Sequence, residues 1–221
     1  MDIIKDPGLA LYLPLFKPDG TSLVSEDARG QGCMVTGALW TPRGRFFDGV
    51  DDLIAVNAVA AGDFFGGAHT IIVWAKLTEW TKFHCPVGAG RTDSVDYWVQ
   101  FYFDKNTGFM HGATCSQAGG TNDVTCNIDL RENPDFHFYA LVVDADGHID
   151  HFIVNDTDCG GADTYNNDLS SIDKLYVGQI PYTSANTNPW KGTIGDVFVF
   201  NRGLTVGEVA FIKQSTGWRY R

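Results

Sequence analysis

Short apolar runs separated by turn-forming residues dominate the hydrophobic pattern of this chain. Continuous or alternating apolar positions occur at 9–16, 70–76, 97–103, 109–113, 136–143, 148–154 and 194–200, with Gly, Asp, Asn or Pro between them. Runs of this length that are rich in aromatic and β-branched residues are typical of strands. The continuous run 70–76 predicts a central strand, and Pro14 places the first strand at an edge or ends its pairing. The runs 97–103 with 109–113, and 136–143 with 148–154, each predict a hairpin.

The stretch 45–56 combines two apolar strand halves with an acidic turn. Aromatic residues precede the turn, and the apolar pattern resumes at Leu53. The turn itself holds one glycine and three carboxylates, Gly49, Asp48, Asp51 and Asp52. Neighbouring carboxylates repel one another unless hydrogen bonds, water or a cation intervene. The stretch is therefore either an ordinary solvated turn or one arm of a calcium site.

One helix is expected near the end of the chain. Thr205 and Glu208 have the spacing of a capping box, apolar residues follow on one face, and Gly217 ends the pattern. Strands and loops elsewhere predict an all-β fold, a two-sheet antiparallel jelly-roll sandwich with one short C-terminal helix. At 221 residues we expect a single domain spanning 1–221, with the segments 1–8 and 213–221 as candidate docking arms.

The charge balance excludes some classes of partner. A formal charge of −11 argues against nucleic acid and against an anionic membrane, since both require clustered Lys and Arg. Nearly all the acid is Asp, which favours turns and hard cations over helices. The first residues lack the basic start and apolar run of a signal peptide, so synthesis in the cytosol is expected.

The five cysteines form no zinc-binding pattern. Free thiols are the expectation for a chain made in the cytosol. Cys115 and Cys126 flank a glycine-rich turn, so a disulfide across that hairpin stays open as an alternative.

Catalytic signatures are weak. A glycosidase of this architecture needs two carboxylates on one strand face, and no glutamate pair is present. Asp144 and Asp146 have the spacing, but they lie beside Gly147 in a predicted turn. No nucleophile elbow and no phosphate-binding loop occur. The sequence therefore favours a binding protein over an enzyme.

Several motifs, taken in order, resemble the laminin-G-like, concanavalin A-like jelly-roll domains of the lectin/glucanase superfamily. They are Asp27-x-x-Gly30-x-Gly32, Leu39-Trp40, the stretch 46–52, the run 72–76 and Trp190-x-Gly192-x-Ile194-Gly195-Asp196-Val197. The resemblance implies two curved antiparallel sheets, a structural calcium ion, and a non-catalytic role in binding glycans or proteins.

The resemblance also implies the calcium ligands. Asp196 is the expected side-chain ligand and Gly49 the expected carbonyl ligand, with Asp48 or Asp51 nearby. Such an ion would join an early strand to a late one. Many members carry two acidic residues before the valine, and here the first is Gly195, which leaves the ion open.

Ligand-binding residues are expected in the loops. Aromatic rings can stack on sugars while amides and carboxylates bond hydroxyls, and the candidates are Trp80, Trp190, Tyr182, Asn186, Asn188 and Asp168. Trp190 has the alternative of packing against the closing strand. The first hypothesis is a lectin-like adhesion module whose partner is a glycan or a protein surface.

The second hypothesis is structural. A domain of a kind usually displayed on surfaces, made without a signal peptide, suits a phage or virus particle as a capsid decoration, fibre or tail component. That hypothesis predicts a homo-oligomer or contacts with capsid or tail proteins, and a place on the virion surface.

Overall fold

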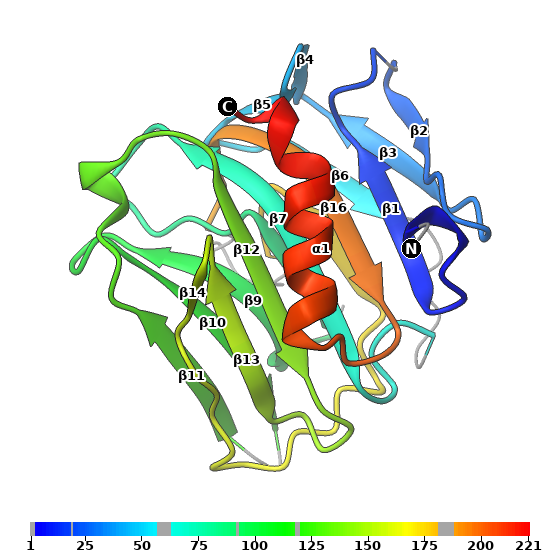
Figure 1. Cartoon of the computed structure of the whole chain (residues 1–221), viewed down its shortest axis with the longest axis vertical. Coiled ribbons are helices and arrows are strands. Elements are labelled where there is room, and N and C mark those ends of the chain that lie inside the picture. Colours follow the sequence, from blue (N-terminus) through cyan, green and yellow to red (C-terminus); the bar gives the residue numbers. More distant parts are fainter. Residues whose placement is uncertain (1–2, 19, 57–62, 92, 118–119, 181–187) are drawn as a thin grey trace.

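The computed structural model describes residues 3–18, 20–56, 63–91, 93–117, 120–180 and 188–221. Two antiparallel sheets of eight strands each form the layers of a sandwich (Figure 1). One α-helix, α1 (Val206–Thr216), lies across the outer face of the first sheet. The predicted all-β jelly-roll sandwich with one short C-terminal helix is confirmed.

The first sheet has the order β14-β13-β12-β7-β16-β5-β4, with β1 paired to β16. Its strands are β1 (Leu9–Pro14), β4 (Leu39–Thr41), β5 (Gly44–Asp48), β7 (His69–Leu77), β12 (His137–Val143), β13 (Ile149–Val154), β14 (Thr157–Asp158) and β16 (Lys191–Phe200).

The second sheet has the order β11-β10-β9-β8-β15-β6-β3-β2. Its strands are β2 (Ser22–Val24), β3 (Gly32–Thr36), β6 (Leu53–Val56), β8 (Val87–Arg91), β9 (Ser94–Asp104), β10 (Phe109–Ser116), β11 (Gly120–Cys126) and β15 (Lys174–Val177). Three short 3₁₀ turns complete the described elements, η1 (Ile3–Lys5), η2 (Leu130–Glu132) and η3 (Gly217–Arg219).

The sequence pattern identified the main strands correctly. β7, the continuous apolar run, lies between β12 and β16 as a central strand. β1 pairs with β16 and ends at Pro14, which has no N–H to donate to a ladder. Both predicted hairpins form, β9 with β10 and β12 with β13.

The acidic stretch 45–56 does not fold back on itself. β5 joins the first sheet beside β16, whereas β6 joins the second sheet between β15 and β3. The turn Gly49–Asp52 therefore carries the chain from one layer to the other. In the first layer Lys191 pairs with Asp48 and Ile194 with Arg45, so early and late strands are neighbours as expected.

Two apolar clusters hold the layers together. The larger one fills the space between the sheets with inward-facing side chains such as Phe47, Phe101 and Trp190, all with no exposed surface. The second cluster lies between the first sheet and α1, where Trp74 and Phe138 pack against Val209 and Ile212. Burial of each large apolar side chain stabilises the fold by about 1.5–3 kcal/mol, which explains why one short helix can be held on an open sheet face.

The ends of the chain pack onto this body. Thr205 caps α1 by accepting from Glu208 N, and the Glu208 carboxylate accepts from Thr205 N in return, as predicted. Asp6 receives a hydrogen bond from Arg202 at 2.6 Å, and Tyr220 is 4% exposed. The described parts of the segments 1–8 and 213–221 are thus in contact with the domain. Within the described residues, no helix has the length and apolarity needed to cross a membrane.

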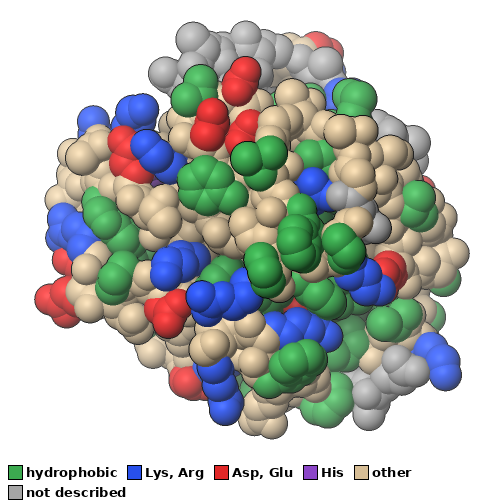
Figure 2. All heavy atoms as spheres, turned by 90° about the horizontal axis from the view of Figure 1, so that it is seen from above, with side chains coloured by type: hydrophobic (Ala, Val, Ile, Leu, Met, Phe, Trp, Pro, Cys, Tyr) green, Lys and Arg blue, Asp and Glu red, His purple; other side chains and the backbone are tan. Residues whose placement is uncertain are grey.

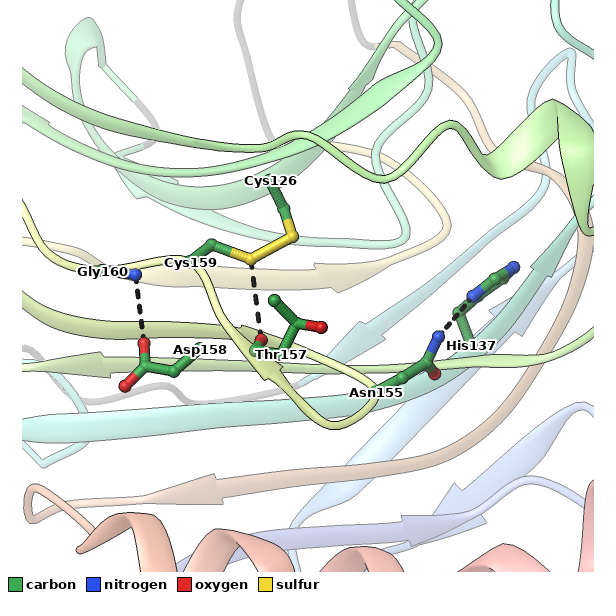
Figure 3. Close-up of a disulfide and its surroundings, with 7 residues drawn as sticks. All are labelled: Cys126, His137, Asn155, Thr157, Asp158, Cys159 and Gly160. Atoms are coloured by element: carbon green, nitrogen blue, oxygen red, sulfur yellow. Dashed lines mark hydrogen bonds between the residues drawn. A yellow bond between two sulfur atoms is a disulfide. The ribbon is translucent and has the colours of Figure 1, made fainter.

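A disulfide joins Cys126, at the end of β11, to Cys159, just after β14 (Figure 3). The expectation of free thiols is therefore wrong for these two cysteines. The alternative pairing of Cys115 with Cys126 is wrong as well, because the β10–β11 register places Cys115 opposite Thr121 and Cys126 opposite Met110. Cys115 and Cys126 therefore lie at opposite ends of the hairpin, too far apart for a disulfide bond.

Candidate functional site

A cavity of about 480 Å³ lies on the outer face of the second sheet. Aromatic side chains and neutral amides dominate its wall, together with one carboxylate. The lining residues are Phe83, Trp98, Gln100, Tyr102, Thr121, Asp123 and Asn188.

The alternation of β9 builds the floor of this cavity. Residues 99, 101 and 103 point into the core with no exposed surface, so 98, 100 and 102 point outward. Gln100 lies opposite Gly88 on one side and Ala113 on the other, and Ala113 in turn lies opposite Asp123. Ile180 and Cys85 cover Gly88, and Ala113 has no exposed surface, so the larger outward side chains form the wall of the cavity.

A polar network closes one side of the cavity. The Tyr102 hydroxyl donates to Asp123 Oδ2 at 2.5 Å, and His111 Nδ1 lies 2.8 Å from Asp123 Oδ1. The His111 ring stacks on Tyr102 with centroids 4.4 Å apart. Burial and then the hydrogen bond to Asp123 raise the pKa of the Tyr102 phenol above its ordinary value. The network thus holds Tyr102 neutral and fixes the Asp123 carboxylate in one orientation.

Gln100 is the polar group of the cavity that lacks a partner. The residue is 6% exposed, and its Oε1 has no hydrogen-bond partner among the described residues. A buried acceptor left unpaired costs about 1–3 kcal/mol. This oxygen is itself shielded from solvent, so a ligand in the cavity could reach it only after rotation of the Gln100 side chain.

The predicted ligand-binding residues are distributed over several places. Asn188 lines the cavity, with a left-handed backbone at φ 46°. Tyr182 and Asn186 lie outside the described residues.

The other three candidates are elsewhere in the fold. Trp190 has no exposed surface and packs in the core beside His84, so it is not available to stack on a sugar at the surface. Trp80 packs edge-on against Phe103, with ring centroids 5.6 Å apart. Asp168 is exposed, and its carboxylate accepts from Ser170 N away from the cavity.

The sequence reasoning missed six of the seven lining residues, namely Phe83, Trp98, Gln100, Tyr102, Thr121 and Asp123. A usable signal was present in the run 97–103, where a polar residue at 100 stands between aromatic residues at 98 and 102 on one strand face. Asp123 could not be found this way, because its place beside Tyr102 depends on the register of β11 against β10 and β9.

Asp196 does not belong to a calcium site with the acidic turn. It lies five residues beyond Lys191, the partner of Asp48, and at about 3.3 Å per residue this separation is roughly 16 Å. Its carboxylate is fully buried and accepts from the Tyr12 hydroxyl at 3.1 Å and from Arg219 Nη1 at 2.8 Å. The predicted ligand set of Asp196 with Gly49 is therefore wrong, since protein donors already satisfy this carboxylate.

The acidic turn retains the properties of a cation site without Asp196. Oxygen atoms of Asp48, Asp51 and Asp52 lie within 4.8 Å of one another. Burial, with Asp48 and Asp51 nearby, raises the pKa of Asp52 although its carboxylate accepts from Asp48 N. Gly49 has φ +81°, and a Cβ there would lie 2.7 Å from Lys191 Cβ. A set of hard oxygens crowded in this way fits calcium.

A separate aromatic surface lies at the end of the molecule that carries β4 and the C-terminus. Figure 2 shows that hydrophobic and basic side chains lie side by side on this end. Trp218 is 67% exposed, and Arg219 lies over both its ring and the Phe16 ring at 5.0 and 4.5 Å. Trp40 donates to the Phe16 carbonyl. This surface provides an exposed tryptophan, Trp218, with no part in the cavity.

Comparison with protein families gives one match of broad coverage. A laminin-G model described as the concanavalin A-like lectin/glucanases superfamily matches residues 47–210, about three quarters of the chain. A comparison with curated protein sequences finds no match.

Solved structures share the fold at low sequence identity. Trypanosoma rangeli sialidase in complex with sialic acid has a TM-score of 0.67 and 19% identity, over 96% of this chain and 34% of that one. The HCR/D W1238A mutant has a TM-score of 0.71 and 11% identity, over 94% and 52%. The NanB sialidase from Streptococcus pneumoniae has a TM-score of 0.56 and 14% identity, over 67% and 24%. The chain thus spans about a third of the Trypanosoma sialidase, and these likenesses show the fold alone.

Proposed function

The chain belongs to the concanavalin A-like lectin/glucanase superfamily, and on that basis we propose that it is a non-catalytic, lectin-like module that binds a glycan in the cavity over β9–β11. The observation that carries this proposal is the cavity wall, where the aromatic residues Trp98, Tyr102 and Phe83 line the same space as the Asp123 carboxylate. Sugars present apolar C–H faces that stack on aromatic rings and hydroxyls that donate to such acceptors. A fold shared with a sialidase in complex with sialic acid supports a carbohydrate-related role.

The charge and the pKa of the lining groups support a proposal of binding without chemistry. Among the described residues of the wall, Asp123 is the single carboxylate, whereas glycoside hydrolysis ordinarily needs two. Tyr102 is an unsuitable nucleophile, because burial and its donation to Asp123 hold the pKa of its phenol high. Release of a sugar from a chromogenic glycoside by the wild-type protein, lost in Asp123→Asn, would contradict the non-catalytic assignment.

A glycan array followed by calorimetric titration tests the binding proposal. We expect Trp98→Ala to weaken binding of the best glycan by tenfold or more, since truncation of an aromatic hot spot costs about 2 kcal/mol or more. Trp218→Ala is the matched control, because this tryptophan is 67% exposed at a different end of the molecule. Equal loss in both variants, or no glycan bound by the wild type in the presence of calcium, would reject the proposal.

We also propose a structural calcium ion at the acidic turn, held by Asp48, Asp51 and Asp52 with the Gly49 carbonyl as a further candidate ligand. The clustered oxygens support it, and the position of the turn between β5 and β6 gives the ion a role in joining the two layers. A chelator is expected to lower the thermal midpoint of unfolding.

A further inference from the structure

The wall of the glycan cavity is poor in positive charge. Its seven lining residues comprise three aromatic side chains, two amides, one threonine and the Asp123 carboxylate. None of the 16 Lys and Arg residues of the chain lines it, and all of them belong to the described ranges. The wall of the cavity therefore carries one carboxylate and no Lys or Arg side chain.

Asp123 is held so that its charge faces the ligand space. Its side chain is 31% exposed, and each oxygen already has one neighbouring group, the Tyr102 hydroxyl or His111 Nδ1. A carboxylate oxygen has lone pairs for further donors, so a sugar hydroxyl can be accepted alongside these neighbours. A carboxylate on the ligand would approach the negative charge of Asp123, and no Lys or Arg side chain of the wall would offset the repulsion.

The aromatic rings add a second preference. A neutral sugar supplies a hydroxyl donor to Asp123, while its apolar face can lie on Trp98 or Tyr102. An N-acetyl amide, which also donates, suits the same wall.

One basic side chain packs against a ring of the cavity wall. Lys105 Nζ lies 5.5 Å from the centre of the Phe83 ring. Since Phe83 lines the cavity and Lys105 does not, this lysine is a basic group that an acidic sugar could recruit.

We propose that this cavity selects uncharged sugars that present donor hydroxyls or an amide, and discriminates against sugars that carry a carboxylate. The inference rests on the proposed glycan-binding function and narrows it to a ligand class.

The test compares two matched ligand pairs by calorimetry at about 0.15 M salt: a galactose-terminated oligosaccharide with its sialylated form, and a glucose oligomer with its glucuronic-acid counterpart. We expect the neutral member to bind at least tenfold more tightly in whichever pair is recognised. In Asp123→Asn the gap should shrink, whereas Asp150→Asn, an exposed aspartate on β13 of the other sheet, makes the same change of net charge and should leave the gap intact.

Salt dependence provides a test that needs no variant. Because salt screens repulsion between exposed charges, the affinity of the carboxylated ligand should rise relative to that of the neutral one as the salt concentration increases. Equal or tighter binding of the carboxylated member would overturn the inference, as would a gap unchanged in a folded Asp123→Asn protein. Loss of carboxylated-sugar binding in Lys105→Gln would identify Lys105 as the anion site and also overturn it.

Failure of the underlying function has a different signature. If neither member of any pair binds, and no glycan on an array is retained, then the glycan-binding function itself is wrong and the selectivity falls with it. If both members bind with equal affinity and Trp98→Ala abolishes both, then the function stands and only the selectivity is rejected.

Discussion

Asp196 and Asp123 show how the surroundings of one residue type decide its role. Asp196 has no exposed surface, and two protein donors, Arg219 and the Tyr12 hydroxyl, reach its carboxylate, while the Tyr220 hydroxyl accepts from its backbone N–H at 2.7 Å. Asp123 lies on an exposed sheet face with capacity for another donor. The first carboxylate is thus structural, and the second is available to a ligand.

This arrangement predicts that the C-terminal turn η3 contributes strongly to stability through one side chain. Arg219→Met should lower the free energy of unfolding by about 3 kcal/mol, because it leaves the buried Asp196 carboxylate without its counter-charge. Urea denaturation monitored by tryptophan fluorescence measures the change. Arg91→Met, which removes a solvent-exposed pair with Asp93, is the control and should leave the midpoint unchanged. Equal midpoints for wild type and Arg219→Met would show that the buried pair adds nothing.

For single residues, the sequence indicated the chemistry of a side chain but not which other side chains lie beside it in the fold. The importance of Asp196 was visible in the motif Ile194-Gly195-Asp196-Val197, yet its partners Tyr12 and Arg219 come from β1 and from beyond α1. The indole ring of Trp190 is of a kind that stacks on sugars, but tertiary packing encloses this side chain in the core. Side-chain roles of this kind depend on contacts between segments distant in sequence.

At the scale of elements, the turn between β5 and β6 is the connection to which the calcium proposal belongs. It leaves the first sheet at Asp48 and enters the second at Leu53, so an ion there would brace a crossing between the layers. A ligand that binds only the native state stabilises it by about 2.7 kcal/mol at a concentration one hundred times its Kd.

Calcium at millimolar concentration should therefore raise the thermal midpoint, and chelation should reverse the rise. Asp51→Asn is expected to abolish this response, whereas Asp150→Asn on β13 should retain it. Differential scanning fluorimetry with and without chelator makes the measurement. An identical thermal midpoint with and without chelator would mean that Asp48, Asp51 and Asp52 form the ordinary solvated turn that the sequence also allowed.

Elements were the level at which the sequence was most informative. Hydrophobic period and turn residues located β7, both hairpins and the capped helix, because these signals are local. The sequence did not reveal that the stretch 45–56 crosses from one sheet to the other, since a strand-turn-strand pattern is the same for a hairpin and for a crossing. The cavity over β9 was likewise partly encoded in the alternation of 98, 100 and 102, but Thr121 and Asp123 join its wall only through the register of β11 against β10 and β9.

At the scale of the whole molecule, the Cys126–Cys159 disulfide joins the edges of the two sheets. Cys126 ends β11 at one edge of the second sheet, and Cys159 follows β14 at the same side of the first (Figure 3). A cross-link of this kind is typical of oxidising surroundings such as cell and particle surfaces.

Removal of this bond should destabilise the sandwich. The double variant Cys126→Ala/Cys159→Ala lacks the cross-link between two residues 33 apart in sequence, so its unfolded state is less constrained. The free energy of unfolding is expected to fall by about 2–4 kcal/mol. Denaturation of the double variant, and of the wild type under a reductant, measures it. Cys115→Ala is the control, because this cysteine is free. A reductant that leaves the wild-type midpoint unchanged would mean that the bond is not formed in solution.

Assembly into a particle stays a prediction. We expect a monomer if the chain acts as a lectin-like module alone, and a trimer or larger ring if it is a capsid decoration, fibre or tail component. Light scattering after size exclusion distinguishes these two cases without reference to any ligand.

The central claim, glycan binding at the cavity over β9–β11, is tested most directly by calorimetric titration of one array-selected neutral glycan against wild type, Trp98→Ala and Trp218→Ala. The structure predicts saturable binding to the wild type, a loss of tenfold or more in Trp98→Ala, and wild-type affinity in Trp218→Ala. Undiminished affinity in a folded Trp98→Ala protein would place the binding site elsewhere and contradict the account.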